Sequence, residues 1–186
     1  TYQNQPSIGH WNLWTWLNNL IPLATPEHKE QFKQDLATCL EKFEPTFLEH
    51  YGQGLCQKMG LPHFHKDSLD CSFAFLRILQ TEQLDYTQSF IRLQNKEYKT
   101  LRDDCLDLRQ FDAFLHQYQE IRKTQERDEL DRVMQSANPH YILRNHMAQK
   151  AIELAERGDF SEVERLFKLL NQPYLKQPDL ETEQDT

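Results

Sequence analysis

Apolar side chains recur every three or four residues along most of this 186-residue chain, and this spacing constrains the fold more than any other feature. It is the period of an α-helix that buries one side. The chain has only five glycines and few β-branched residues, which argues against a sheet-rich fold. Apolar residues make up 38% of the chain, as expected for helices that each bury a narrow stripe. The sequence therefore predicts an all-α fold of about seven to eight helices.

The first predicted helix, over about residues 8–21, is unusually aromatic. Trp11, Trp14 and Trp16 fall within six residues of each other. Burial of a single tryptophan contributes ~3 kcal/mol or more, whereas several exposed tryptophans reduce solubility. We therefore expect this helix to lie beneath other segments of a larger structure, and the isolated chain to expose an apolar face near these three residues.

Prolines and one glycine predict the boundaries in the first third of the chain. Pro6 disfavours helix at the residue before it, so the first six residues are expected to form an extended arm. Thr25 and Pro26 have the N-cap and first-position pattern of a second helix. Pro45 should kink or restart that helix, and Gly60 should end it.

Further helices are predicted over 67–80, from near Asp85, and over about 97–135 with room for one break. The end of the chain, residues 172–186, is polar and acidic. We expect it to form a disordered tail, which leaves residues 1–171 as the helical region.

Capping patterns predict two helices before that tail. Asn138 and Pro139 have the pattern of an N-cap followed by a first-turn proline, and Gly158 should end the helix that they begin. Ser161 and Glu164 have the spacing of a capping box, in which each side chain bonds the backbone N–H of the other residue.

Charge and hydropathy exclude several classes of function. The net charge is −8 and no basic run is present, which argues against nucleic-acid binding. No stretch approaches the ~20 apolar residues of a membrane span, and the first residues lack the basic region of a secretory signal. The four cysteines are widely spaced without a C-x-x-C pair, so we expect reduced thiols and a cytoplasmic protein.

Candidate sites for phosphate and metal are weak. The glycines of GQG at 52–54 could approach a phosphate, but they lie within a predicted helix and no Lys-Ser/Thr follows them. Cys56, His63, His65 and Cys71 surround one loop and have the side-chain types of a zinc site. The intervals between these four residues do not match those of known zinc motifs. The simpler interpretation is two exposed histidines and two helical thiols.

Other polar groups also fail to form an active site. Two acidic pairs could bind a cation, although pairs on solvated helices are usually surface charge; they are Asp67 with Asp70 and Asp103 with Asp104. The trio Arg144, Asn145 and His146 lies between apolar residues on a predicted helix, so one of the three should face inward. That residue would be a hydrogen-bonded structural group, or would support a neighbouring active-site loop.

Three segments carry a resemblance to a known family. Residues 4–13 read NQPSIGHWNL, residues 84–93 read LDYTQSFIRL, and residues 138–170 begin NPHYILRNHMAQKAI and continue with GDFSE. They are similar to the N-Q-P-x-I/V-x-x-W-N-L, D-Y-T-x-x-F-R-x-L and N-P-K-Y-x-L-R-N-x-x-A-Q-x-A-I patterns of the SelO family, the selenoprotein O type protein adenylyltransferases. The third segment is the most specific, and the three occur in the family's order.

The resemblance implies a protein-kinase-like fold that binds ATP with Mg²⁺ or Mn²⁺ and transfers AMP onto Ser, Thr or Tyr hydroxyls of other proteins. It also implies that the family's catalytic, nucleotide-binding and metal-binding residues precede the N-Q-P-x-I segment, with which this chain starts. No residue is therefore assigned a catalytic, cofactor-binding or metal-binding role. The chain is expected to be the helical C-terminal part of the larger lobe of a bacterial, cytoplasmic enzyme. It should be inert alone, and its partners would be the N-terminal segments and the enzyme's protein substrates.

The resemblance has a gap, and other functions remain open. Family members often carry a cysteine or selenocysteine near the C-terminus that is tied to redox regulation, whereas the last cysteine here is Cys105. One alternative is a non-enzymatic interaction module that docks a partner through the Trp11 and Trp14 face. Another is a small metal-binding helical protein centred on the loop between Cys56 and Cys71.

Overall fold

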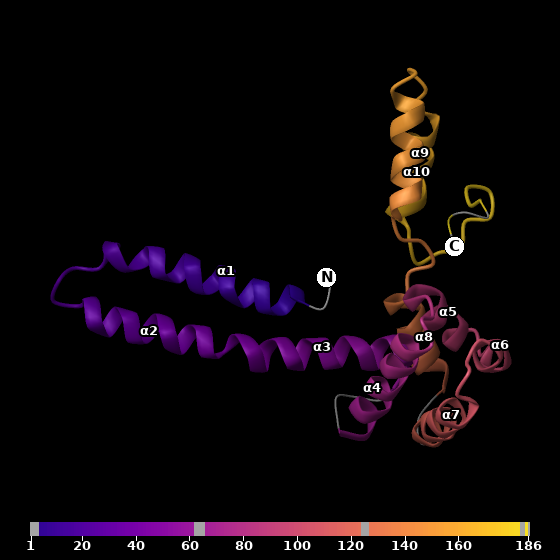
Figure 1. Ribbon diagram of the computed structural model, residues 1–186, viewed down its shortest axis with the longest axis horizontal. Coiled ribbons are helices and arrows are strands. Elements are labelled where there is room, and N and C mark those ends of the chain that lie inside the picture. The colour runs from indigo at the N-terminus through magenta and orange to yellow at the C-terminus, as the bar shows by residue number, and fades with distance from the viewer. Residues whose placement is uncertain (1–3, 62–65, 124–126, 183–184, 186) are drawn as a thin grey trace. The chain divides into compact units, whose positions relative to one another are not determined.

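The computed structural model describes residues 4–61, 66–123, 127–182 and 185, and every regular element in these ranges is a helix (Figure 1). The all-α prediction is therefore confirmed. The chain divides into two compact units, Thr1–Gln53 and Gly54–Thr186, which we call the N-terminal and C-terminal units.

The N-terminal unit is a helical hairpin. Helix α1 (Gln5–Leu20) continues into a short 3₁₀ turn (Ile21–Leu23), and α2 (Lys29–Glu41) returns alongside α1 (Figure 1). The extended arm predicted for the first six residues is wrong where the structure describes them. Pro6 lies in the first turn of α1, where a missing backbone N–H leaves no hydrogen bond unmade.

The boundaries around α2 are confirmed in part. Thr25 does not cap the helix, because its carbonyl accepts the N–H of His28 at 3.0 Å and closes a turn. Helix α2 therefore begins only at Lys29. The restart predicted from Pro45 is confirmed, since the chain turns at Lys42 before α3 (Phe43–Met59) begins. The proline falls in the first turn of α3, where its ring clashes with no preceding helical turn.

The C-terminal unit contains the main hydrophobic core. Helices α4 (Lys66–Thr81), α5 (Tyr86–Gln94), α6 (Tyr98–Asp103), α7 (Leu108–Arg122) and α8 (Arg127–Ala137) pack with the end of α3. The stretch predicted over 97–135 is thus divided among α6, α7 and α8. Aromatic rings join α4, α5 and α7: Phe75 stacks on Phe114 with centroids 4.9 Å apart and meets the edge of Phe90 at 5.2 Å.

Gly60 ends α3, as the sequence predicts. Its φ of +56° lies in the left-handed region that glycine adopts without strain. This geometry lets the N–H of Leu61 donate to the carbonyl of Cys56 at 2.9 Å. A β-carbon at Gly60 would lie 2.7 Å from Met134 Sδ, so the close approach of α8 also requires a glycine here.

A second hairpin, α9 (Asn145–Ala155) and α10 (Ser161–Asn171), follows α8. It has its own small core of Tyr141, Met147, Ala151, Leu166 and Leu169. The predicted N-cap at Asn138 is wrong, because α9 begins seven residues later at Asn145. Asn138 is instead buried, and its amide donates to the carbonyl of Lys58 at 2.8 Å and to Gln94 Oε1 at 3.2 Å. This tertiary role competes with capping.

The capping box predicted at the start of α10 is also wrong. Ser161 is already the first helical residue, and Phe160 occupies the N-cap position without a side-chain bond. The N–H of Ser161 is satisfied by Asp159 Oδ1 at 2.9 Å, while Glu164 bonds through its own N–H to the carbonyl of Phe160.

The segment predicted to be a disordered tail makes several contacts with the hairpin where the structure describes it. The carbonyl of Pro173 accepts the N–H of His140 at 2.7 Å, and the N–H of Gln177 donates to the hydroxyl of Tyr141 at 2.8 Å. Asp185 accepts two hydrogen bonds from Arg165.

Candidate functional site: an aromatic face and buried polar anchors

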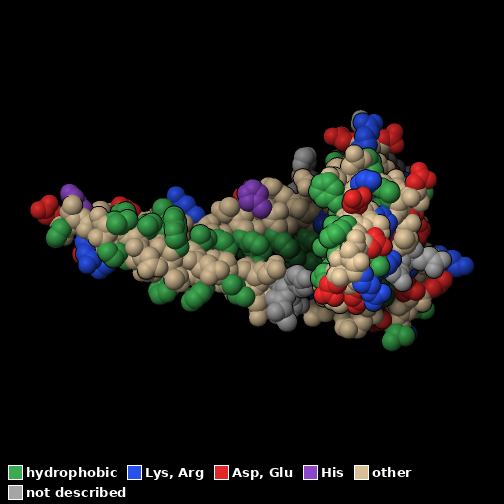
Figure 2. All heavy atoms as spheres, turned by 90° about the horizontal axis from the view of Figure 1, so that it is seen from above, with side chains coloured by type: hydrophobic (Ala, Val, Ile, Leu, Met, Phe, Trp, Pro, Cys, Tyr) green, Lys and Arg blue, Asp and Glu red, His purple; other side chains and the backbone are tan. Residues whose placement is uncertain are grey.

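The aromatic face of α1 remains largely uncovered. None of the residues of α1 is buried, and the exposed fractions are 60% for Trp11, 50% for Trp14 and 60% for Trp16. Hydrophobic side chains are visible on the surface of the N-terminal unit in Figure 2. The periodicity that predicts a buried stripe therefore describes a helix that has apolar surface without a partner in this unit.

Two hollows lie between α1 and the helices packed against it. One of about 510 Å³ has Trp14, Leu17 and Leu36 among its lining residues. The other, of about 490 Å³, is lined on the α1 side by Leu13 and Leu17. Mostly apolar hollows beside an exposed aromatic ring are typical of a docking surface.

The trio Arg144, Asn145 and His146 does not converge on one site. Arg144 precedes α9 and donates from Nη1 to Asp85 Oδ2 at 2.8 Å, while Asn145 and His146 are exposed. Asp85 also caps α5, because its Oδ1 accepts the N–H of Gln88 at 2.8 Å. The hydrogen bond from Arg144 lowers the pKa of Asp85.

This ion pair joins two of the three segments that carry the family resemblance. Asp85 belongs to LDYTQSFIRL and Arg144 to the segment that begins NPHYILRN. The inward-facing member predicted for the trio is thus Arg144, with 26% of its side chain exposed. Its partner is a carboxylate on an adjacent helix terminus, so the pair fixes the segment before α9 against the start of α5.

Sequence reasoning missed a second anchor, centred on Lys58. Its ammonium donates to the carbonyl of Ala137 at 2.9 Å and lies 5.5 Å from the ring centroid of Phe90. Burial lowers the pKa of Lys58. Nothing in the spacing of α3 marks this lysine, because its partners come from α5 and from the last residue of α8, and they meet only in the folded molecule. The hydrogen bond from Lys58 thus holds the end of α8 against α3.

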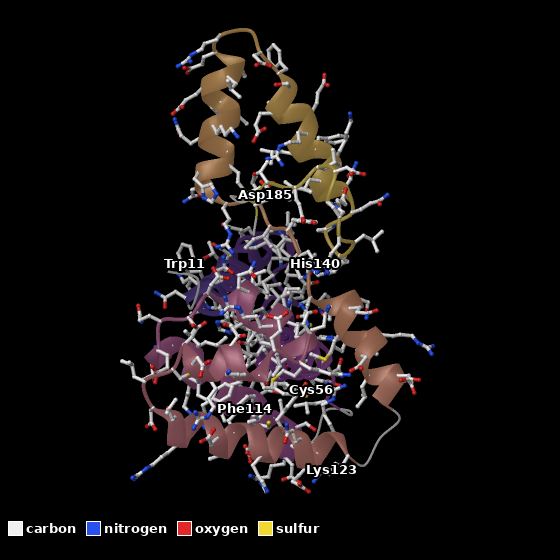
Figure 3. The ribbon with its side chains drawn as sticks, turned by 90° about the vertical axis from the view of Figure 1, so that its right-hand side faces the viewer. Trp11, Cys56, Phe114, Lys123, His140 and Asp185 are labelled. Carbon is white, nitrogen blue, oxygen red and sulfur yellow. The ribbon has the colours of Figure 1, made fainter. Side chains whose placement is uncertain are left out.

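The metal-site hypothesis gains no support from the described residues. Cys56 and Cys71 are buried in the bundle, and Figure 3 shows Cys56 among the helices that also hold Phe114. Burial raises the pKa of both thiols, to about 12 for Cys71. Within the described ranges no three His, Cys, Asp or Glu side chains are placed to hold a metal ion. His63 and His65 lie outside those ranges.

The remaining sequence candidates have structural roles. The GQG residues lie within α3, where helical hydrogen bonds occupy the backbone N–H groups that a phosphate would need. The acidic pairs do not form cation sites: Asp70 binds Lys66 at 2.6 Å and Asp104 binds Arg92. No helix in the described part of the chain has the length and hydropathy needed to cross a bilayer.

Comparison with known proteins gives a consistent family. The family model described as protein adenylyltransferase SelO matches residues 1–171. Two similar curated proteins are both named protein nucleotidyltransferase YdiU. The one from Pectobacterium atrosepticum is 35% identical over an alignment of 184 positions, which covers 96% of this chain and 37% of that protein. The one from Pseudomonas fluorescens is 34% identical over an alignment of 189 positions, which covers 98% of this chain and 37% of that protein.

The chain thus spans little more than a third of the length of these relatives, whereas the family model covers nearly all of its helical region. The segments that meet through Asp85 and Arg144 lie within the matched range. On this match, the chain belongs to the SelO family of protein nucleotidyltransferases.

Proposed function

We propose that this chain is the helical C-terminal part of a protein adenylyltransferase, within the larger lobe of a protein-kinase-like domain. The complete enzyme would transfer AMP from ATP to Ser, Thr or Tyr hydroxyls of proteins, with Mg²⁺ or Mn²⁺ bound by segments that precede this one. The observation that carries the proposal is the family match over residues 1–171 in a chain that spans 37% of its relatives.

In this proposal the helices support the catalytic segments and do not react themselves. Phosphoryl- or nucleotidyl-transfer chemistry needs a cation-binding carboxylate set and a cradle for phosphates. In the described ranges no metal-binding group is assembled and the one glycine pair with suitable spacing is helical. The chain alone is therefore proposed to be inert, and its contribution is the position it gives to neighbouring segments.

The aromatic face of α1 is the proposed contact with those preceding segments. The three tryptophans are each half or more exposed, and Trp14 also lines one of the two hollows, so they provide a large area to bury. Each ring would contribute up to ~3 kcal/mol when covered.

Reconstitution tests this proposal. The chain is mixed with a separately expressed polypeptide that precedes Thr1 in the encoding gene, and transfer of labelled AMP to protein is measured. The chain alone should show no transfer, and the mixture should. Replacing Trp11 and Trp14 by serine should abolish the gain. Leu106→Ser is the matched control, because Leu106 is 94% exposed and lies in the C-terminal unit. AMP transfer by the chain alone would contradict the proposal.

The second candidate is a non-enzymatic interaction module that docks another protein through the same Trp11 and Trp14 face. The exposure of these residues favours docking but does not select the partner. The gene decides between the two functions. A coding sequence upstream of Thr1 that contains a glycine-rich loop and a metal-binding Asp motif supports the enzyme, whereas a start codon at that position supports the module.

A further inference from the structure

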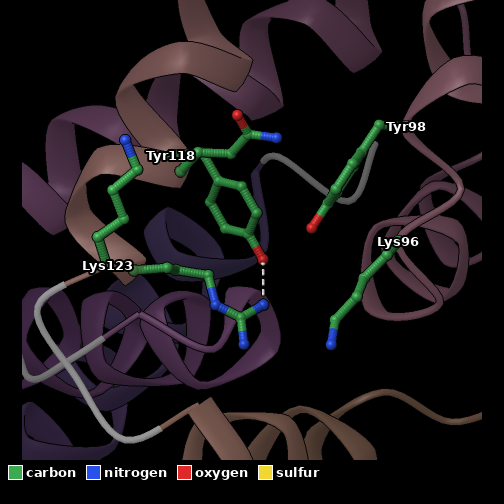
Figure 4. Close-up of a pocket in the computed structure, with 6 residues that line it drawn as sticks. Lys96, Tyr98, Tyr118 and Lys123 are labelled. Atoms are coloured by element: carbon green, nitrogen blue, oxygen red, sulfur yellow. Dashed lines mark hydrogen bonds between the residues drawn. The ribbon is translucent and has the colours of Figure 1, made fainter.

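A pocket in the C-terminal unit has an unusual set of lining residues for so acidic a protein. It has a volume of about 290 Å³ and lies between the end of α7 and the chain that joins α5 to α6 (Figure 4). Its lining residues are Lys96, Tyr98, Tyr118, Gln119, Arg122 and Lys123. Three of these six are cations and none is a carboxylate, although the chain has a net charge of −8.

Local structure places these side chains around one space. Tyr118 and Arg122 lie four residues apart on the last turns of α7, and Gln119 has the same spacing from Lys123, the C-cap residue. The members of each pair therefore lie side by side at this end of the helix. Lys96 follows α5 with a φ of +62°, in a turn closed by the N–H of Glu97 donating to the carbonyl of Arg92. In Figure 4 the Tyr98 side chain points toward the Tyr118 hydroxyl, and the Lys96 side chain extends into the same space from the same side.

The Arg122 guanidinium is held rigidly at the base of this pocket. Its Nη1 donates to the Tyr118 hydroxyl at 2.8 Å, and that hydroxyl donates to the carbonyl of Met59 at 2.8 Å. Its Nη2 binds Asp131, and only 9% of the side chain is exposed. The guanidinium is thus oriented before any ligand arrives, which reduces the entropic cost of binding.

The cations are only partly neutralised by the protein. Asp131 is shared between Arg122 and Lys96, which lies 2.8 Å from it, so one carboxylate serves two positive charges. Lys123 pairs with Glu120, but both side chains are about half exposed. Such surface pairs are worth ~0–1 kcal/mol and exchange readily for a stronger anion.

We propose that this pocket is a binding site for a small phosphate monoester with a flat apolar group. A phosphomonoester carries about −1.5 to −2 charges at pH 7, which suits a pocket with more than one positive charge available, whereas a carboxylate carries one. The partly exposed Tyr98 ring and the alkyl parts of Lys96 and Lys123 provide apolar walls for the remainder of the ligand, while Tyr118 is buried behind them. This proposal does not depend on the proposed function.

The test is a calorimetric titration of the complete 186-residue chain with phenyl phosphate, inorganic phosphate and phenol. Phenyl phosphate should bind most tightly, inorganic phosphate about tenfold more weakly, and phenol without measurable heat, since charge and ring both contribute. Binding should weaken as salt is raised from 50 to 300 mM. Equal affinity for phenol and phenyl phosphate would overturn the proposal, as would no binding of phenyl phosphate at millimolar concentration.

Two variants locate the site. Lys96→Gln should lower the affinity for phenyl phosphate about tenfold, the loss of one charge-assisted hydrogen bond. Lys99→Gln is the matched control: it makes the same charge change on α6 at an exposed position that does not line the pocket, and should alter affinity less than twofold. Lys123→Gln provides a second lining variant if Lys96→Gln lowers the melting temperature. Equal losses in the lining and control variants would show only non-specific attraction and would contradict the site.

Discussion

Some residues in this chain have a role that the local sequence reveals, and others have a role that only the structure reveals. Gly60 has one role of each kind. Its role as a helix stop is readable from the sequence, because glycine favours the left-handed conformation after a helix. Its second role, to admit Met134 at close range, depends on where α8 packs and is visible only in the structure.

Substitution of Gly60 by alanine should therefore cost more than the same change at the other left-handed glycine. Gly158 has a φ of +84°, but a β-carbon there would meet nothing within 4 Å. We expect Gly158→Ala to lower the free energy of unfolding by about 1 kcal/mol from backbone strain. Gly60→Ala should lower it by about 2–4 kcal/mol, because a clash with Met134 is added. Urea denaturation of both variants measures the difference, and equal losses would contradict the packing at α8.

The amide of Asn138 provides a second test at this scale. Asn138→Ala removes the donor to the carbonyl of Lys58 and to Gln94 in a buried site, so we expect a loss of about 1–3 kcal/mol in unfolding free energy. Asn145→Ala is the control, because this asparagine is exposed at the start of α9. If Asn138 acted as the helix cap that the sequence predicts, truncating its side chain would instead reduce the helicity of the segment that follows it.

At the scale of elements, the sequence predicts that helices exist better than where they begin. The apolar period identifies α4, α5 and α10 because burial of one face decides it. Starts depend on which group satisfies the first free N–H groups, and several groups compete. At α10 that group is Asp159 rather than the predicted Ser161. The start of α9 is displaced because Asn138 bonds to residues more than forty positions away in the chain.

The hairpin of α9 and α10 should lose stability in acid. Arg165 hydrogen-bonds both Glu162 and Asp185. The bond from Arg165 lowers the pKa of Glu162. For Asp185, burial acts to raise the pKa, but bonds from Arg165 and Thr182 lower it overall. A carboxyl whose pKa is lower in the folded state stabilises the fold above its unfolded pKa of ~4, and this contribution disappears as the pH falls through the folded value.

We therefore expect the urea concentration at which the α9–α10 hairpin is half unfolded to decrease between about pH 5 and pH 3. The double variant Glu162→Gln with Asp185→Asn should be less stable at pH 7 and should show a shallower decrease. Glu164→Gln, an exposed substitution on the same helix, should retain the slope of the original chain. Parallel acid profiles for the double variant and the original chain would show that the contacts to Arg165 contribute nothing to folding.

For the molecule as a whole, the sequence predicts the helical class and the family but assigns no functional residue. The three sequence motifs identify the family. The structure shows that two of these motifs are in contact, because Asp85 of one forms an ion pair with Arg144 of the other. The cationic pocket could not be predicted, because its residues come from two segments that are twenty or more positions apart in the chain, and no motif links them. Converging side chains of this kind are a property of tertiary packing.

The exposed aromatic face of α1 leads to a prediction for the whole chain in solution. Uncovered rings bind the dye ANS, so the chain should give stronger dye fluorescence than an ordinary monomer of its size. The variant Trp11→Ser, Trp14→Ser, Trp16→Ser should lose most of that fluorescence without a change in helix content, because none of the three side chains is buried. Adding the preceding segments should lower the fluorescence of the original chain and leave that of the variant unchanged. Dye binding at the level of an ordinary monomer would mean that the face is already covered, and α1 would then no longer be available as the contact that the proposed function requires.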